Sequence, residues 1–441
     1  MNAASQEDPR ELALVVHPDR RRTECGRDPR ARLDEAVGLA SALDLEVAGA
    51  LIAPIRQARP STLFGPGKLG EIGDLRAESA ASIIVVDDAL SPVQQRNLER
   101  AWDAKVIDRT GLILEIFARR ARTAEGRLQV ELARLDYERS RLVRTWTHLE
   151  RQRGGFGFLG GPGETQIEAD RRLIGERITR LRADLADVRR TRGLARRARR
   201  RVPYPAIALV GYTNAGKSTL FNRLTGAKVL AKAALFATLD PTLRRLPLPD
   251  GRPAILSDTV GFISDLPHEL VEAFRATLDE VREADIILHV RDISGPQSDA
   301  EAEDVAQVLQ EMDLGPDTGR KILEVWNKVD SVAPDDRQAL DARARRAGAV
   351  PVSALTGEGI DDLIKRLAEM VDDSPELTFR LAASDGEGLA WLYRHGRVTS
   401  REMTSDGALV RARLDPQAHG RFQRLRPGAE LPAAVVNAAA E

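Results

Sequence analysis

The sequence predicts an α/β protein whose central domain is a doubly wound, mostly parallel sheet. Short apolar runs begin near residues 206, 254, 285, 321 and 349, and helical patterns separate them. A glycine-rich loop directly follows the first run, and polar motifs follow three of the later ones. Buried parallel strands read as apolar runs, and ligands bind at their carboxyl ends. These observations together favour a sheet with a ligand site along one edge.

The loop after the first run is a complete phosphate-binding loop. Its glycines, Gly211 and Gly216, let the backbone curl so that N–H groups point at phosphate oxygens. We expect Lys217 to reach the β- and γ-phosphates and Ser218 to ligate Mg²⁺. The alternative is a chance match, which the apolar run before the loop and the helix from Ser218 disfavour. The predicted nucleotide contacts are Gly211, Tyr212, Thr213, Asn214, Ala215, Gly216, Lys217 and Ser218.

A second glycine-rich stretch, Gly65-Pro66-Gly67-Lys68, has leucine after its lysine and so offers no hydroxyl for a metal. We interpret it as a turn before a helix that starts near Leu69.

Two further motifs complete the predicted phosphate site. Asp258, at the end of the second apolar run, can hold a water molecule bound to Mg²⁺. The Gly261 N–H can contact the γ-phosphate and so sense hydrolysis. Thr238 is the candidate second protein ligand of Mg²⁺, and Thr242 is its competitor. The predicted contacts are Phe236, Ala237, Thr238, Leu239, Asp240, Asp258, Thr259, Val260 and Gly261.

The sequence Asn327-Lys328-Val329-Asp330 predicts guanine as the base. A carboxylate at Asp330 can accept hydrogen bonds from the ring N–H and the exocyclic amine of guanine, a pair that adenine lacks. We expect Asn327 to contact the other edge of the base and the Lys328 stem to pack along the ring. A polar turn is the alternative when the motif is taken alone. A backbone N–H from Ser353, Ala354 or Leu355 would reach the guanine carbonyl.

The residue after Gly261 is Phe262, where many GTPases place a glutamine that orients the attacking water. We therefore expect slow intrinsic hydrolysis that a partner accelerates. The Asn214 amide oxygen is a candidate ligand for K⁺ near the phosphates, although asparagine also has structural roles in turns. The candidate catalytic residues are Lys217, Thr238, Gly261 and Asn214.

Composition indicates a soluble chain that can bury hydrophobic cores, because 42% of its 441 residues are hydrophobic and 30% are charged. No apolar run is long enough to span a bilayer, and no signal peptide opens the chain. Cys25 is the single cysteine, so no internal disulfide can form. We expect a cytoplasmic protein without stable membrane insertion and without DNA as a partner. The oligomeric state is open.

We predict four domains: an N-terminal α/β domain at 1–125, a helical hairpin at 126–201, a P-loop GTPase domain at 202–372, and a small α+β domain at 373–441. The first should contain strands at 12–17, 45–52 and 82–86 and helices at 31–43 and 92–102. The last should contain a strand at 378–381, a helix at 387–395 and a hairpin that turns at Asp406-Gly407. In the GTPase domain we also expect an antiparallel strand at 242–246 and a final helix at 359–371.

Apolar residues spaced alternately three and four apart predict the hairpin as two long antiparallel helices. They are Leu128, Leu132, Leu135, Leu142, Trp146 and Leu149 on one side, with Arg139 in the slot between Leu135 and Leu142, and Ile167, Ile174, Ile178, Leu181, Leu185 and Val188 on the other. The glycine-rich loop 154–163 exposes Phe156, Phe158 and Leu159, which could stack on unpaired bases, enter a protein groove or fold back on the hairpin. Eight arginines at 189–201 could attract a phosphate backbone or form a solvated linker.

Three stretches of the sequence resemble HflX-type GTPases. They are residues 110–142, residues 161–166 (Gly-Pro-Gly-Glu-Thr-Gln) with Asp170-Arg171-Arg172, and residues 236–240 (Phe-Ala-Thr-Leu-Asp). The resemblance implies that the hairpin enters the large ribosomal subunit and that loop 154–163 contacts ribosomal RNA. One departure is that Leu159 and Gly160 stand where many relatives place an arginine. The resemblance also implies hydrolysis that the ribosome stimulates.

The combined interpretation is a GTPase that uses Mg²⁺ and K⁺, converts GTP to GDP, and binds the large ribosomal subunit and its RNA. It would couple nucleotide state to ribosome dissociation, rescue or control of subunit association. The alternatives are a signalling or docking switch that acts on a protein partner, and an RNA-processing or ribosome-assembly GTPase.

Overall fold

The computed structural model describes most of the chain. The described residues are 11–20, 28–152, 162–199, 204–227, 235–236, 238–239, 241–249, 253–264, 275–315, 318–371, 376–404, 407–414 and 416–431. The chain divides into two compact units, one made of residues 1–246 and 254–360 and the other of 247–253 and 361–441. The four-domain division drawn from the sequence stays a prediction.

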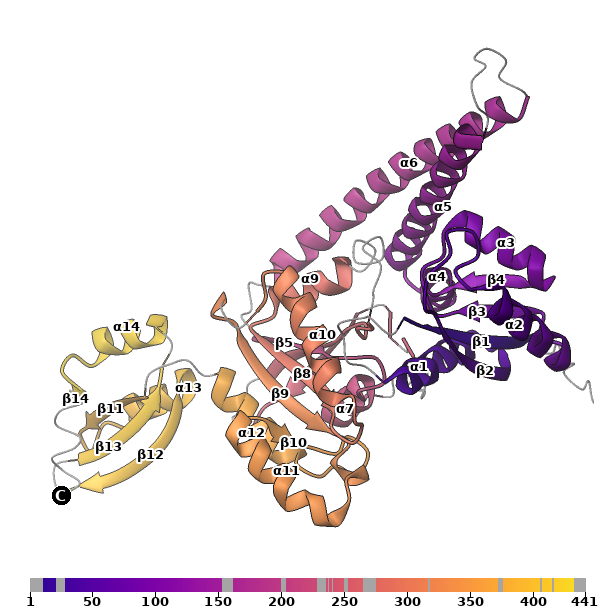
Figure 1. The fold of residues 1–441 in the computed structure, drawn as a ribbon. Helices are drawn as coiled ribbons and strands as arrows, with labels where there is room; N and C mark the ends of the chain where they lie inside the picture. The colour runs from indigo at the N-terminus through magenta and orange to yellow at the C-terminus, as the bar shows by residue number, and fades with distance from the viewer. Residues whose placement is uncertain are drawn as a thin grey trace, which may run out of the picture. The chain divides into compact units, whose positions relative to one another are not determined.

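The N-terminal part is a four-stranded parallel sheet in the order β2-β1-β3-β4 (Figure 1). Alternate residues of β1 and β3 face two separate cores, because successive side chains of a strand point to opposite faces. The elements are β1 (Leu12–Asp19), α1 (Pro29–Ala42), β2 (Glu46–Pro54), α2 (Pro66–Ser79), β3 (Ile83–Val86), α3 (Pro92–Trp102), β4 (Lys105–Asp108) and α4 (Arg109–Arg120).

The three strands and two helices predicted here are confirmed, with ends that differ by a few residues. The sequence also predicts a turn at 65–68 and the start of a helix near Leu69. This start is wrong, because the helix, α2, begins at Pro66. Gly65 is the N-cap, and a proline suits the first helical position, where its missing N–H has no intrahelical partner. Lys68 lies in this first turn and pairs with Glu71 at 2.6 Å, a structural role.

The two long helices are confirmed as α5 (Ala124–Gln152) and α6 (Pro162–Arg199), which pack side by side (Figure 1). Ile178, Leu181 and Leu185 of α6 are buried, as the apolar spacing predicts. Ion pairs cross between the helices from Arg177 to Glu131 at 2.7 Å and from Arg182 to Asp136 at 3.6 Å.

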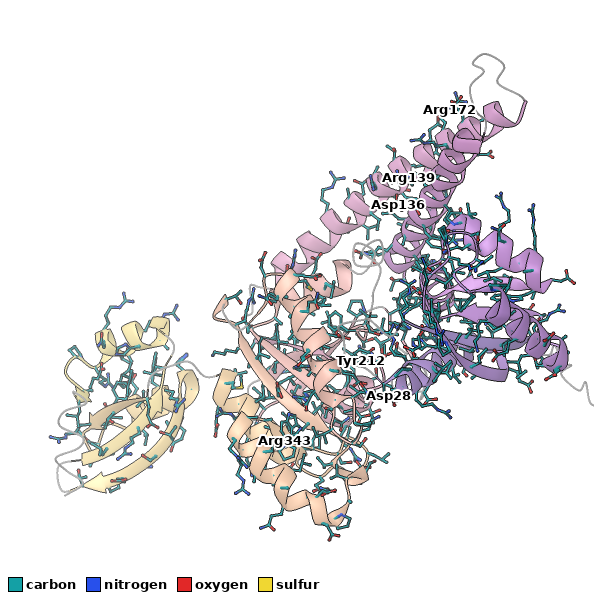
Figure 2. The ribbon with its side chains drawn as sticks, in the orientation of Figure 1. Asp28, Asp136, Arg139, Arg172, Tyr212 and Arg343 are labelled. Carbon is teal, nitrogen blue, oxygen red and sulfur yellow. The ribbon has the colours of Figure 1, made fainter. Side chains whose placement is uncertain are left out.

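Asp136 and Arg139, labelled in Figure 2, also pair along α5 at 2.8 Å. Among the predicted features, Phe156, Phe158 and Leu159 of the loop, the side chains of Leu142, Trp146, Leu149 and Ile167, and those of most of the arginine cluster lie outside the described part of the chain.

The central sheet has the order β10-β9-β8-β5-β7-β6, and β5, β7, β8, β9 and β10 pair in parallel. This arrangement brings the carboxyl ends of five strands to one edge, where the predicted motifs meet. The strands are β5 (Ala206–Val210), β6 (Thr242–Pro247), β7 (Pro253–Asp258), β8 (Ile286–Asp292), β9 (Lys321–Asn327) and β10 (Val350–Pro351). The helices of this region are α7 (Lys217–Thr225), α9 (Arg275–Glu283), α10 (Ser298–Glu311) and α11 (Pro334–Ala347). The predicted added strand is present as β6; its direction stays a prediction.

The second unit contains nearly all of α12 (Ile360–Val371), the predicted final helix, and an antiparallel sheet in the order β12-β13-β11-β14. The predicted strand, helix and hairpin are present, although Asp406 itself lies outside the described residues. Phe379 and Phe422 meet edge to face at 4.9 Å in its core. The elements are β11 (Glu376–Leu381), α13 (Gly386–His395), β12 (Arg397–Thr404), β13 (Gly407–Arg413), α14 (Pro416–Leu425) and β14 (Glu430–Leu431).

No helix among the described residues is both long enough and apolar enough to cross a membrane.

Candidate nucleotide-binding site

The phosphate loop follows β5 and leads into α7, as the sequence predicts. Gly216 has a φ of +91°, in the left-handed region that favours glycine. A Cβ at this position would lie 2.2 Å from the Asn327 Nδ2 atom. Both the backbone and the close approach of the asparagine therefore require glycine here.

Gly216→Ala is expected to weaken guanine-nucleotide binding by about 100-fold, since the methyl group must displace both the loop and Asn327. Gly226→Ala is the matched control. Gly226 also has a positive φ, of +66°, at the other end of the same helix, but nothing lies within 4 Å of its Cβ position. Fluorescence titration with a labelled GDP measures both. Equal affinities for the two variants would contradict the prediction.

Lys217 is the buried cation of the loop. Its Nζ donates to the carbonyl oxygens of Gly211 at 3.0 Å and Tyr212 at 2.6 Å. Burial lowers the pKa of Lys217 to about 8, although the nearby Asp258 charge partly offsets this effect. A buried ammonium whose partners here are two neutral carbonyls is well suited to an anionic ligand.

Three oxygen-bearing side chains converge beside the lysine. The Ser218 and Thr238 hydroxyls lie 2.8 Å apart, and each lies within hydrogen-bonding distance of Asp258 Oδ2, at 2.7 and 2.9 Å. Asp258 Oδ1 is buried without a hydrogen-bond partner among the described residues. Burial raises the pKa of Asp258, and the hydrogen bond from Ser218 and the charge of Lys217 oppose that rise. Hard oxygens and an unpartnered carboxylate oxygen fit a hydrated Mg²⁺.

Thr242, the competitor for the metal, instead begins strand β6. The geometry therefore favours Thr238. In the described part of the chain no group of three or more His, Cys, Asp or Glu side chains could hold a metal.

The backbone of Phe262 pairs with the phosphate loop. The Phe262 N–H donates to the Gly211 carbonyl at 3.1 Å, and the Thr213 N–H donates to the Phe262 carbonyl at 2.7 Å. A Cβ on Gly261 would lie 3.0 Å from Lys217 Nζ. The Phe262 side chain is buried in the core, so it is not available to orient a water molecule.

The base motif is tied to the phosphate loop through Asn327. Its Nδ2 donates to the Ala215 carbonyl at 2.8 Å, and its Oδ1 accepts the Ala354 N–H at 3.0 Å. Asp330 is exposed, and its Oδ1 accepts the Ser353 hydroxyl at 2.5 Å. This hydrogen bond is the main cause that lowers the pKa of Asp330, so the group is a carboxylate at neutral pH.

Two further residues at this edge of the central sheet belong to none of the nucleotide-binding motifs. Asp292 accepts from Lys328 Nζ at 2.6 Å, and Arg223 donates to the carbonyl oxygens of Ala354 and Leu355. Asp292 is the last residue of β8, and its place at the carboxyl end of an apolar run was the available signal. Arg223 lies on α7 and gives no signal of this kind.

Several predicted contacts face inward. Phe236 is buried and meets Phe117 edge to face at 4.6 Å, and Leu239 and Val260 are buried as well. Thr259 donates its hydroxyl to the Leu209 carbonyl. Val329 is also buried. These buried side chains support the site by packing in the core. Ala237 and Asp240 lie outside the described residues.

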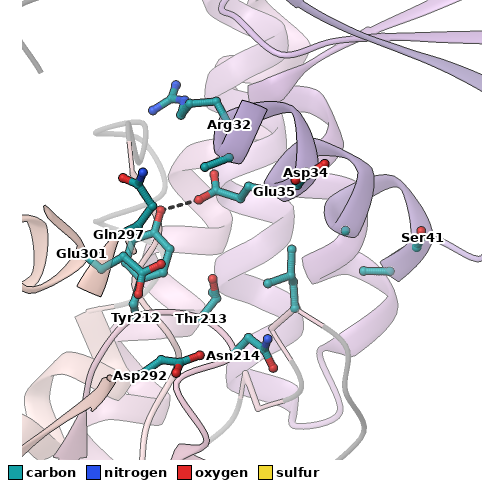
Figure 3. A pocket seen from close by; sticks show the side chains of 14 residues that line it. Arg32, Asp34, Glu35, Ser41, Tyr212, Thr213, Asn214, Asp292, Gln297 and Glu301 are labelled. Atoms are coloured by element: carbon teal, nitrogen blue, oxygen red, sulfur yellow. Dashed lines mark hydrogen bonds between the residues drawn. The ribbon is translucent and has the colours of Figure 1, made fainter. Parts of the chain in front are cut away.

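Asn214 is exposed at the tip of the loop with a φ of +59°. It lines a cavity of about 350 Å³ together with Thr213, Asp292 and residues of α1 (Figure 3).

A parallel sheet with a phosphate loop after β5 and Asn-Lys-Val-Asp starting at the last residue of β9 defines a P-loop GTPase. Four family models match successive parts of the chain: "GTP-binding GTPase N-terminal" at 30–118, "GTP-binding GTPase Middle Region" at 120–199, "50S ribosome-binding GTPase" at 206–328, and "HflX C-terminal domain" at 339–426.

Full-length relatives agree with these models. A GTPase HflX of Magnetococcus marinus is 48% identical over 93% of this chain and 94% of its own, and one of Escherichia coli is 44% identical over 86% and 88%. A GTP-binding protein of Sulfolobus solfataricus in complex with GDP covers 82% of this chain and 98% of its own, with a TM-score of 0.44 and 23% identity. On the family models and the HflX relatives, the chain belongs to the HflX family of GTPases, and it hydrolyses GTP.

Proposed function

We propose that this GTPase binds the large ribosomal subunit and couples GTP binding and hydrolysis to ribosome dissociation, rescue or control of subunit association. The observation that carries the proposal is the match to the "50S ribosome-binding GTPase" model over residues 206–328, the segment that holds the nucleotide site. Binding of the chain to isolated large subunits, with a GTP analogue and with GDP, tests it. The cytoplasm is the compartment that this function requires.

The geometry at the sheet edge supports the nucleotide contacts that we propose from the sequence. Gly211 to Ser218 hold the phosphates, and Asp330, Asn327 and the segment 353–355 hold guanine. Asn327 links the two halves, because it bonds to both the phosphate loop and Ala354. A shift of the base is thereby transmitted to the phosphates through one side chain.

Ser218 and Thr238 are the proposed protein ligands of Mg²⁺, and Asp258 is the acceptor for its bound water. When bound, Mg²⁺ neutralises charge on the β- and γ-phosphates. The chain's own contribution is to position: Lys217 provides a fixed positive charge, and Gly261 places an N–H beside it. This arrangement would stabilise the charge that develops on the γ-phosphate.

Asn214 is the proposed K⁺ ligand. We expect hydrolysis to be at least about fivefold faster in potassium than in sodium buffer of equal ionic strength, since a correctly sized monovalent cation adds positive charge beside the phosphates. Asn214→Ala should remove the difference. Phosphate release measured in both salts checks this, and equal rates for the wild-type chain would contradict it.

The hairpin carries loop 154–163, for which we propose contact with ribosomal RNA. The ion pairs and buried residues that join α5 to α6 provide a rigid support, and function is often found in loops on such supports. The basic cluster at 189–201 would add attraction for phosphate groups.

Replacing 154–163 by a short Gly-Ser linker is expected to abolish separation of ribosomal subunits, because the contacting residues are lost, while affinity for GTP stays within about twofold. Light scattering of 70S particles and nucleotide titration measure the two effects. A matched variant, Phe156→Ala with Phe158→Ala, tests the aromatic rings alone. Unimpaired separation after loop replacement would contradict the role of the loop.

A further inference from the structure

The strand order β2-β1-β3-β4 of the N-terminal sheet reverses between β1 and β3, and doubly wound folds typically bind ligands at the carboxyl ends of the strands at such a point. We call this place the crevice. In this chain it is filled by the buried side chains of His17 from β1, Asp87 after β3 and Arg109 after β4. His17 Nδ1 lies 2.8 Å from Asp87 Oδ2, and Arg109 Nη1 donates to Asp87 Oδ1 at 2.5 Å.

The crevice receives a residue of the nucleotide-binding region. Arg109 Nη2 donates to the carbonyl oxygen of Ser264 at 3.1 Å and to its hydroxyl at 3.2 Å. Arg109 and Ser264 are only 4% and 5% exposed. Arg32 also donates to the Ser264 hydroxyl, at 3.0 Å. Ser264 of the same chain thus lies where other doubly wound folds bind a ligand.

A second path leads from the crevice to the phosphate loop. Glu35 of α1 accepts from Arg109 Nη2 and, at 2.5 Å, from the Tyr212 hydroxyl (Figure 3). The Tyr212 hydroxyl in turn accepts the Ser264 N–H at 2.9 Å. Glu35, Arg109, Tyr212 and Ser264 therefore form a closed ring of hydrogen bonds, which we call the crevice network.

The crevice network fixes one end of the segment 261–264. The backbone bonds of Phe262 to Gly211 and Thr213 fix a second point of this segment. Gly261 directly precedes Phe262, a Cβ on it would lie 3.0 Å from Lys217 Nζ, and its N–H donates to no described residue. The two anchors thus hold the Gly261 backbone next to the buried lysine.

Charged neighbours hold the Arg109 side chain of the crevice network in one orientation. Burial alone would raise the pKa of Asp87, but the Arg109 guanidinium and the hydrogen bond to His17 outweigh it and lower that pKa to about 2. Arg109 therefore faces anionic partners on two sides, Asp87 and Glu35, which orient its guanidinium toward Ser264.

We propose that Glu35 and Arg109 are positioning residues for the γ-phosphate: through Tyr212 and Ser264 they hold the Gly261 N–H in place and thereby favour GTP over GDP. A donor held in place before binding loses no entropy when the phosphate arrives. Coupling is reciprocal, so the γ-phosphate also strengthens the hold of the crevice on Ser264. The inference rests on the proposed role of Gly261 and is independent of the ribosomal partner.

The test compares the affinities of a non-hydrolysable GTP analogue and of GDP for the purified full-length chain without ribosomes. Glu35→Gln and Ser264→Ala each weaken the network while leaving the Arg109–Asp87 pair in place. We expect the analogue to bind about tenfold more weakly and GDP to change by less than about twofold, the scale of one hydrogen bond to a charged group. Single-turnover hydrolysis should slow by a similar factor.

Asp34→Asn is the matched control, because Asp34 is the neighbouring carboxylate on α1 and is exposed. It should leave both affinities unchanged. Arg109→Met should give a larger loss for the analogue, and circular dichroism checks that the variant folds. If that variant unfolds, Glu35→Gln and Ser264→Ala decide the question alone.

Equal losses for the analogue and GDP would show a merely structural network and overturn the proposal. Unchanged affinities, or tighter binding of the analogue, would overturn it as well. Failure of the wild-type chain to bind large subunits would refute the proposed function. It would not affect the ratio of the affinities for the GTP analogue and GDP, on which this inference is tested.

Discussion

Asp330→Asn is expected to lower the affinity for GTP by about 1,000-fold, the largest effect anticipated for a single change in the base site. The exposed carboxylate is the proposed partner of the two N–H donors of guanine, and the hydrogen bond from Ser353 lowers its pKa. An amide in its place turns one acceptor into a donor that faces a donor. Xanthosine triphosphate, which carries a carbonyl where guanine has its amine, should bind the variant better than GTP does.

Competition against a labelled guanine nucleotide measures both affinities. Asp336→Asn is a suitable control, since this residue lies in the first turn of α11 and carries the same charge. GTP affinity that stays unchanged in Asp330→Asn, or a failure of xanthosine triphosphate to compete, would refute the assignment of the base site.

Lys217→Met is expected to reduce GTP hydrolysis by at least about 1,000-fold, because the change removes the positive charge that we propose lies beside the γ-phosphate. The same change should leave thermal stability unchanged or raise it. A buried charged lysine whose pKa is lowered to about 8 is costly in the nucleotide-free chain, and methionine fills a similar volume without a charge.

Phosphate release and thermal melting of nucleotide-free protein give the two readouts. Lys365→Met, on the exposed side of α12, controls for the loss of a lysine elsewhere. Hydrolysis at the wild-type rate would disprove the role of Lys217, and a large drop in melting temperature would show that its charge is structural.

The sequence was sufficient for features that depend on local patterns. The phosphate loop, the strands of the central sheet and the two long helices follow from motifs and periodicity, and their positions are confirmed to within a few residues. Strand β4 and helix α4 were not predicted. β4 is four residues long, and periodicity alone does not distinguish so short an apolar segment from part of a buried helix.

Contacts between distant parts of the chain could not be predicted. Arg109 and Ser264 are 155 residues apart, and Glu35 and Tyr212 are 177 apart, so no spacing rule relates them. Nothing in the sequence distinguishes Arg109 from the many other arginines of the chain. Its burial distinguishes it, and burial is visible only in the structure. The convergence of Ser218, Thr238 and Asp258, by contrast, was predictable because each belongs to a motif with a known place at the sheet edge.

We expect GTP to control binding of the chain to the large ribosomal subunit. Cosedimentation with purified large subunits measures this binding in parallel with a non-hydrolysable GTP analogue, GDP and no nucleotide. The chain should pellet with subunits at least about tenfold more tightly with the analogue than with GDP, and Asp330→Asn should lose this difference. Equal binding in all three conditions, or none in any of them, would refute control of binding by GTP.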